Sequence, residues 1–157
     1  MRRAWAWPHQ RRASGAVQGQ STRGCRAVSN ALPPIWADSE ELELAILNLV
    51  TNSLDAMPKG GTLTIRAAAS ETGVRVEVSD TGTGIPKELL PRIFDPWVTT
   101  KTAGHGTGLG LSITHDVIAR HGGTIVAASD PGRETLFTIE LPSAPAAETV
   151  DVQNSDR

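Results

Sequence analysis

Two kinds of hydrophobic periodicity alternate along the chain, and their order limits the folds available to it. Apolar residues three or four positions apart indicate helices, whereas apolar residues at every second position indicate strands. The predicted elements are a helix over 39–57, strands over 62–68 and 74–80, a short helix over 86–93, a helix over 108–121, and strands over 124–129 and 136–141. We therefore predict an α+β fold, a two-layer sandwich of helices on a mixed, mainly antiparallel sheet.

This pattern extends over residues 27–142, which we predict to be the single domain of the chain. At 157 residues the chain is too short for two domains of ordinary size. The segment 143–157 is small and polar without periodicity, so we expect a disordered tail. Residues 1–26 hold six arginines and no acidic residue, without regular spacing, so we expect a basic, disordered arm.

Composition also limits the partners that we expect. The irregular arginines of the arm do not form the basic stripe typical of a nucleic-acid interface, so no nucleic-acid partner is predicted. No apolar run is long enough to cross a bilayer, and no secretory signal follows the basic start. We therefore expect no membrane segment in this chain and a cytoplasmic location.

A row of polar side chains runs along the first predicted helix. Asn48, Asn52 and Asp55 are four and three residues apart, so they share one helix face. The row can be an ordinary solvated face. Asparagine is, however, a poor helix former, because its side chain competes for backbone groups. Amide and carboxylate oxygens can also hold a hard cation such as Mg²⁺, which takes few protein ligands.

An aspartate followed by two glycines ends the second predicted strand, in the sequence Asp80-Thr81-Gly82-Thr83-Gly84. This pattern is common in turns. It also suits the recognition of a planar base. A carboxylate can accept a hydrogen bond from an exocyclic amine, and glycines let the backbone approach the ring closely.

Four glycines at alternate positions precede the second long helix, within GHGTGLGLS at 104–112. A flexible linker would have the same composition. Glycine turns at a helix N-terminus also present free N–H groups and the positive end of the helix dipole, where a phosphate can bind. The pattern is neither a P-loop nor a Rossmann fingerprint.

Together these segments resemble the N, G1, F and G2 boxes of sensor histidine kinases. The matching segments, in the order of that family, are NLVTNSLDAM at 48–57, DTGTGIP at 80–86, IFDPWVTTK at 93–101 and GHGTGLGLS at 104–112. The resemblance covers roughly residues 30–142 and implies the Bergerat-type ATP-binding fold.

The resemblance assigns roles to the polar row. Asn52 matches the asparagine that binds Mg²⁺ between the phosphates, and Asn48 matches the one that lies near the phosphates a turn earlier. Asp55 would support them. The related gyrase and heat-shock ATPases carry a water-activating glutamate where this chain has Asn48, so Asn48 is not expected to be such a base.

The resemblance also assigns the base and phosphate contacts. Asp80 matches the aspartate that reads the adenine amino group, and Gly82, Gly84 and Ile85 would form the pocket around the base. Lys101 resembles a lysine that approaches the phosphates, and with Asn48 it is the residue expected to assist phosphoryl transfer. The expected lid contacts are Gly106, Thr107, Gly108, Leu109 and Gly110.

Two features depart from the family or need a structural explanation. The family has a glycine, two threonines and Phe near its end, where this chain has Glu134-Thr135-Leu136-Phe137 after Arg133, so the missing glycine leaves the backbone of that turn uncertain. Trp97 stands where many relatives carry Phe, and we expect it to pack on the core as a loop anchor.

The implied function is Mg²⁺-dependent transfer of the γ-phosphoryl group of ATP to a histidine. The chain contains no segment like the family's acceptor-histidine box. We therefore expect the acceptor on a separate or missing dimerisation domain, with a response regulator as an indirect partner, and an isolated chain that is inactive. The alternatives are a nucleotide-binding regulatory module without kinase activity and a serine kinase of the anti-sigma type.

Overall fold

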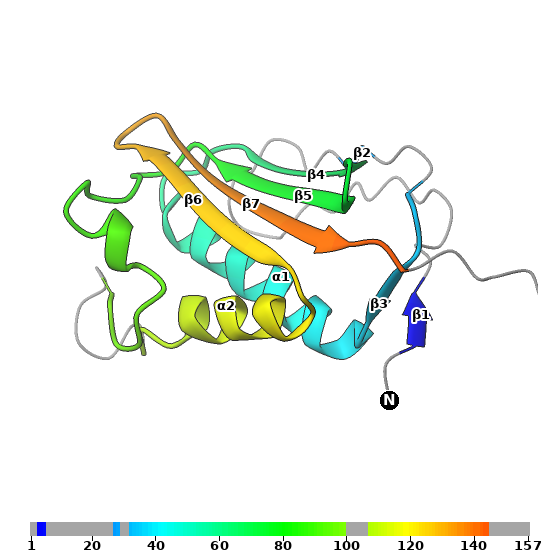
Figure 1. The fold of residues 1–157 in the computed structure, drawn as a ribbon. Coiled ribbons are helices and arrows are strands. Elements are labelled where there is room, and N and C mark those ends of the chain that lie inside the picture. Colours follow the sequence, from blue (N-terminus) through cyan, green and yellow to red (C-terminus); the bar gives the residue numbers. More distant parts are fainter. Residues whose placement is uncertain (1–2, 6–26, 29–31, 100–106, 145–157) are drawn as a thin grey trace, which may run out of the picture.

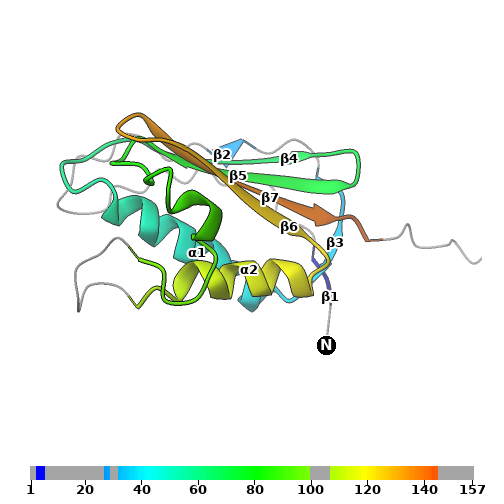
Figure 2. The same cartoon turned by 60° about the vertical axis from the view of Figure 1, so that its left-hand side comes forward.

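A five-stranded sheet covered on one face by two helices forms the body of the protein. The computed structural model describes residues 3–5, 27–28, 32–99 and 107–144. The elements in that part are β1 (Arg3–Trp5), β2 (Ala27–Val28), β3 (Ile35–Ala37), α1 (Ser39–Asp55), β4 (Leu63–Ala69), β5 (Gly73–Asp80), the 3-10 turn η1 (Leu90–Arg92), α2 (Gly110–Arg120), β6 (Thr124–Asp130) and β7 (Glu134–Pro142). Figures 1 and 2 show both helices on the same side of the sheet.

The strand order is β2-β4-β5-β7-β6, and this arrangement confirms the predicted fold class. Both predicted hairpins form, β4 with β5 and β6 with β7, and β5 pairs antiparallel with β7 at the centre. Only β2 is parallel to its neighbour, β4. The register places Asp80 at the end of β5, directly opposite Thr135 of β7.

Helix α1 begins where its capping signal predicts. The Asp38 carboxylate accepts hydrogen bonds from the amides of Glu40 and Glu41 at 3.0 and 3.3 Å, satisfying N–H groups that have no partner within the helix. The same Asp38 donates its own amide to His121 Nε2 at 3.0 Å. The C-terminal end of α2 is thereby joined to the start of α1.

The buried face of α1 differs from the apolar stripe that periodicity predicts. That stripe comprises Leu44, Leu47, Val50, Leu54 and Met57, yet Leu44 and Leu47 are 50% and 56% exposed. The fully buried positions of α1 are instead Ala45, Leu49 and Ser53. This helix has more apolar residues than one face can hold, so packing against α2 and the sheet determines which of them are buried.

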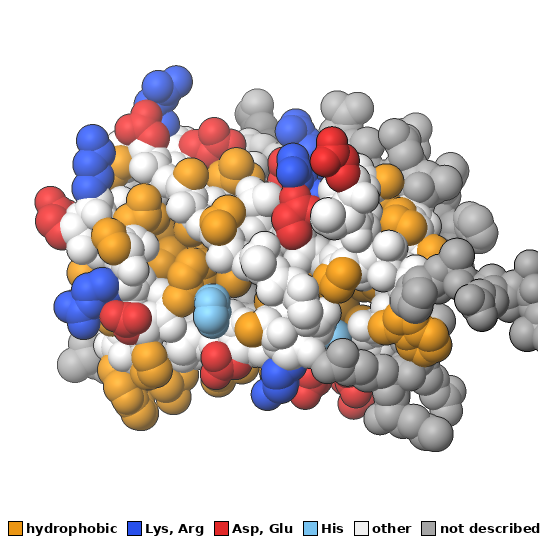
Figure 3. Space-filling model, in the orientation of Figure 1, with side chains coloured by type: hydrophobic (Ala, Val, Ile, Leu, Met, Phe, Trp, Pro, Cys, Tyr) orange, Lys and Arg blue, Asp and Glu red, His pale blue; other side chains and the backbone are white. Residues whose placement is uncertain are grey.

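Two further predictions about local structure are wrong. The predicted short helix over 86–93 is reduced to η1, because Pro91 in its centre has no N–H to donate and its ring obstructs a continuing α-helix. Trp97 does not pack on the core, since it is 72% exposed. Figure 3 shows hydrophobic atoms at the lower left, where the loop after η1 lies in Figure 1.

The terminal segments are described only in part. Within the arm expected to be disordered, Arg3–Trp5 form a strand antiparallel to β3, so the structure differs from that expectation at these residues. The remainder of the arm lies outside the described residues, as does the tail after 144. No helix in the described part is long and apolar enough to cross a membrane.

Candidate nucleotide site

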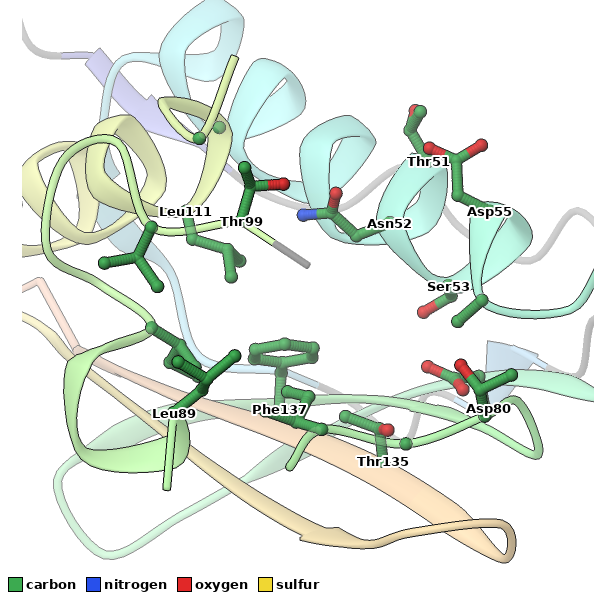
Figure 4. A pocket seen from close by; sticks show the side chains of 18 of the residues that line it. Thr51, Asn52, Ser53, Asp55, Asp80, Leu89, Thr99, Leu111, Thr135 and Phe137 are labelled. Atoms are coloured by element: carbon green, nitrogen blue, oxygen red, sulfur yellow. The ribbon is translucent and has the colours of Figure 1, made fainter. Parts of the chain in front are cut away.

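A cavity of about 530 Å³ opens between α1, the sheet and the segments that flank 100–106. Figure 4 shows its walls: Asn52 projects from α1 toward the interior, while Thr135 and Phe137 rise from the sheet. Its lining residues from the predicted site are Asn52, Asp55, Gly84, Ile85, Asp80, Thr107, Gly108 and Gly110. The structure thus brings three segments distant in sequence around one space.

Asp80 forms the buried polar end of the cavity. It is only 2% exposed, and its Oδ1 accepts a hydrogen bond from the Gly82 amide at 2.9 Å. Burial raises the pKa of the Asp80 carboxyl, and the negative charge of Glu134 acts in the same direction. The Gly82 amide and the nearby Ser53 hydroxyl oppose this rise. Removal from water disfavours a charge, so this carboxylate gains strongly from a hydrogen-bond donor.

Ser53 faces Asp80 across the same end of the cavity (Figure 4). The residue is 1% exposed. Its hydroxyl lies close enough to Asp80 to favour the charged carboxylate, yet within the described residues it makes no hydrogen bond of normal geometry. Leaving a buried hydroxyl without a partner costs about 1–3 kcal/mol. Such a group in a cavity wall is suited to a polar ligand atom.

The loop after Asp80 needs glycine at two positions. A Cβ on Gly82 would lie 2.6 Å from the Ala56 carbonyl oxygen, because this loop lies against the end of α1, where the Thr83 amide donates to that same carbonyl at 3.0 Å. Gly84 has a φ of +78°. Its Cβ would lie 2.6 Å from the Pro131 Cα. Both glycines therefore permit close backbone approach.

The β6–β7 turn forms despite the glycine missing before Thr135. The left-handed conformation falls on Gly132, with φ of +80°, and the Arg133 amide donates to the Asp130 carbonyl at 3.0 Å. Glu134 can then take an extended conformation opposite Asp130. The Gly132 amide donates to the Thr83 carbonyl at 3.0 Å, which joins this turn to the loop after β5.

The other end of the cavity is formed by the start of α2. Gly110 is the first residue of this helix, so the predicted start at 108 is two residues early. Gly108 instead has a φ of +67° and packs so closely on Trp97 that a Cβ would lie 2.6 Å from the Trp97 carbonyl carbon. The Trp97 amide donates to the Gly108 carbonyl at 3.0 Å, so these two residues lie side by side.

The remaining predicted site residues occupy different places. Asn48 is not part of the cavity wall, and its side-chain amide donates to the Gly110 carbonyl at 3.4 Å. Gly82 and Leu109 are sequence neighbours of residues that line the cavity, but they do not line it themselves. Asp55 is exposed at the rim beside Thr51 (Figure 4). Lys101 and Gly106 lie outside the described residues.

Sequence reasoning did not identify several residues in the cavity wall. These are Thr51, Ser53, Ala56, Thr83, Leu89, Ile93, Val98, Thr99, Leu111, Thr135 and Phe137. Thr135 and Phe137 fall in the segment compared with the family's glycine-threonine-threonine-Phe pattern, so a signal was available for them. No sequence signal pointed to Ser53, because a single serine after Asn52 has no distinctive spacing.

Comparisons with known proteins agree with this fold. The family model described as histidine kinase-, DNA gyrase B-, and HSP90-like ATPase matches residues 37–145. The sensor histidine kinase ZraS of Escherichia coli K12 is 41% identical over 114 residues, which cover 73% of this chain and 24% of that protein. The chain therefore spans about a quarter of the length of this curated relative.

Solved structures show the same similarity. The catalytic domain of histidine kinase ThkA has a TM-score of 0.65 and 35% identity, covering 76% of this chain and 80% of that one. Full-length ShkA in complex with AMPPNP has a TM-score of 0.65 and 31% identity, covering 78% of this chain and 27% of that one.

Proposed function

This chain belongs to the family of histidine kinase-, DNA gyrase B- and HSP90-like ATPases, and we propose that it transfers the γ-phosphoryl group of ATP to a histidine nitrogen. Its similarity to ZraS and ThkA makes it the ATP-binding catalytic domain of a sensor histidine kinase. The acceptor histidine belongs to a dimerisation domain, in the same polypeptide or a separate one, and a response regulator receives the phosphoryl group from it. The reaction takes place in the cytoplasm, where ATP is available.

The buried carboxylate of Asp80 carries the proposal. One of its oxygens is occupied by the Gly82 amide, which leaves Oδ2 to accept a hydrogen bond from the exocyclic amino group of adenine. Guanine presents a carbonyl oxygen at that position, so two acceptors would face each other in a buried site. Such a mismatch strongly disfavours the wrong base.

The phosphates fit the other end of the cavity. The first turn of α2 offers free N–H groups and the positive end of its dipole, and Gly108 and Gly110 keep this backbone accessible. Asn52 projects into the cavity at that end (Figure 4) and would hold Mg²⁺ together with phosphate oxygens. The cation would neutralise phosphate charge.

In the proposed transfer, the histidine nitrogen forms a bond to the γ-phosphorus while the bond to the bridging oxygen breaks and ADP leaves. The residues of this chain contribute by binding and orienting ATP. Positioning of this kind can lower the barrier substantially, because it removes the entropic cost of bringing the reactants together. Asn48 supports the site through Gly110, and Lys101 is proposed to approach the phosphates.

The phosphotransfer experiment tests the proposal directly. The purified chain is incubated with γ-labelled ATP, alone and with a histidine-bearing dimerisation domain of a related kinase. We expect no label on the chain alone and acid-labile label on the added domain, because phosphohistidine is destroyed by acid. Acid-stable label on a serine would instead support the anti-sigma class. ATP binding without transfer to several such domains would support the regulatory module.

Replacing Ser53 with alanine tests whether its buried hydroxyl serves the nucleotide. We expect ATP affinity to fall about 2- to 10-fold, the effect of one neutral hydrogen bond. The melting temperature without nucleotide should fall slightly at neutral pH, because the Ser53 hydroxyl favours the charged form of the buried Asp80 carboxyl. Calorimetry and thermal unfolding measure the two effects.

Ser70→Ala is the matched control. The Ser70 hydroxyl, in the turn between β4 and β5, is also buried and makes no hydrogen bond within the described part of the chain. This variant should leave ATP affinity unchanged. If both variants bound ATP like the wild type, Ser53 would have no role in the nucleotide site.

A further inference from the structure

Ser129 of β6 joins two residues that line the cavity, Ile85 and Thr135, without lining the cavity itself. Its hydroxyl oxygen accepts a hydrogen bond from the Ile85 amide at 2.9 Å. The same oxygen lies 3.2 Å from the Thr135 hydroxyl and 3.2 Å from the Glu134 carbonyl oxygen. Ile85 and Thr135 both line the cavity, and Thr135 lies directly opposite Asp80 in the sheet.

The hydrogen-bond capacity of Ser129 allows two arrangements. A hydroxyl group has one hydrogen and two acceptor positions, and the Ile85 amide uses one acceptor position. If the hydrogen points to Glu134, Thr135 donates to Ser129 and presents lone pairs to the cavity. If it points to Thr135, the Thr135 hydrogen is available to a ligand. Ser129 therefore controls whether Thr135 offers a donor or an acceptor next to Asp80.

Adenine favours the second arrangement. Its amino group is next to an unprotonated ring nitrogen, so the edge that reaches Asp80 presents a donor beside an acceptor. An acceptor at Asp80 and a donor at Thr135 match that edge. Guanine presents the opposite order, a carbonyl oxygen beside a ring N–H. The pair Asp80 and Thr135 can therefore distinguish the two bases when Ser129 directs its hydrogen to Thr135.

We propose that Ser129 is a positioning residue for base recognition, which orients the Thr135 hydroxyl as a donor toward the base. The proposal rests on the proposed function, because it requires an adenine nucleotide in this cavity. Ser129 acts through Thr135, so its effect must depend on the Thr135 hydroxyl.

A double-mutant cycle on the full chain tests this dependence, with ADP and GDP affinities measured by calorimetry. Ser129→Ala should lower ADP affinity roughly three- to tenfold and reduce the preference for ADP over GDP by a similar factor. Ser129→Thr keeps the hydroxyl and should remain within about twofold of the wild type in both measurements. In a Thr135→Val background, Ser129→Ala should change ADP affinity by less than about twofold.

Several results would overturn the inference. These are wild-type ADP affinity in Ser129→Ala, equal loss in Ser129→Thr, or the same loss with and without the Thr135 hydroxyl. If Ser129→Ala did not fold, Ser129→Cys would replace it, because a thiol has similar size but bonds weakly. A wild-type chain that binds no ADP would reject the proposed function itself, whereas normal ADP binding with an inert Ser129 would reject only this inference.

Discussion

Replacing Asp80 with asparagine is expected to weaken ATP binding about 10- to 150-fold, the largest effect of any single change at the base end of the cavity. This range corresponds to about 1.5–3 kcal/mol for a hydrogen bond to a charged group. Asparagine can keep the bond from Gly82 through its carbonyl oxygen. Its NH₂ group would then face the adenine amino group, so two donors would oppose each other. Calorimetry with ATP and GTP measures the loss of affinity and of preference.

The same variant is expected to be at least as stable as the wild type without nucleotide. Burial raises the pKa of Asp80 above its ordinary value of 3.8, so between the two values the folded state binds more protons than the unfolded chain. The free energy of unfolding therefore falls as pH rises through that interval, and it stays lower above it. Asparagine has no such dependence. The stability gained by Asp80→Asn should be larger at pH 7 than near pH 4.

Asp116→Asn is the control for charge alone, because Asp116 is exposed on α2 outside the cavity. It should change neither ATP affinity nor base preference. An Asp80→Asn variant that bound ATP normally and kept its preference over GTP would show that Asp80 does not read the base.

Replacing Gly84 with alanine is expected to lower the free energy of unfolding by about 3 kcal/mol or more. A positive φ costs an alanine about 1–2 kcal/mol. The added Cβ would also lie 2.6 Å from the Pro131 Cα, which is backbone and cannot move without displacing the turn. Urea unfolding of the variant and the wild type measures the difference.

Gly132→Ala separates these two costs, since Gly132 has nearly the same φ, +80°, and a Cβ added there would meet no atom within 4 Å. It should lose only about 1–2 kcal/mol. Equal losses at Gly84 and Gly132 would show that contact with the β6–β7 turn does not determine the need for glycine at 84. Ligand affinity should fall in Gly84→Ala only, because Gly84 lines the cavity.

Local signals predicted most of the secondary structure. The cap at Asp38, the two hairpins and the glycine-rich start of the second long helix correspond to α1, β4–β7 and α2 within two or three residues. These signals depend on neighbours in sequence, such as a capping carboxylate or alternate apolar positions. Strands β1, β2 and β3 have only two or three residues, too few for a periodic pattern.

The candidate site was predictable to the extent that its residues fall in motifs. The polar row on α1, Asp80 and the glycines before α2 could be named from spacing and from the resemblance to histidine kinases. Ser53 and Ser129 could not, because each acts through a contact with a distant segment. Ser129 is 44 residues from Ile85 in the sequence, yet its hydroxyl binds the Ile85 amide.

The sequence by itself determined the order of helices and strands, the cap of α1 and the three polar or glycine-rich segments, because each depends on interactions between near neighbours. The tertiary structure decided which face of α1 is buried, since Ala45 and Leu49 are buried while Leu44 and Leu47 remain exposed. It also placed Thr135 opposite Asp80. Burial and strand register depend on surfaces that meet only when distant segments pack together, so no local pattern could specify them.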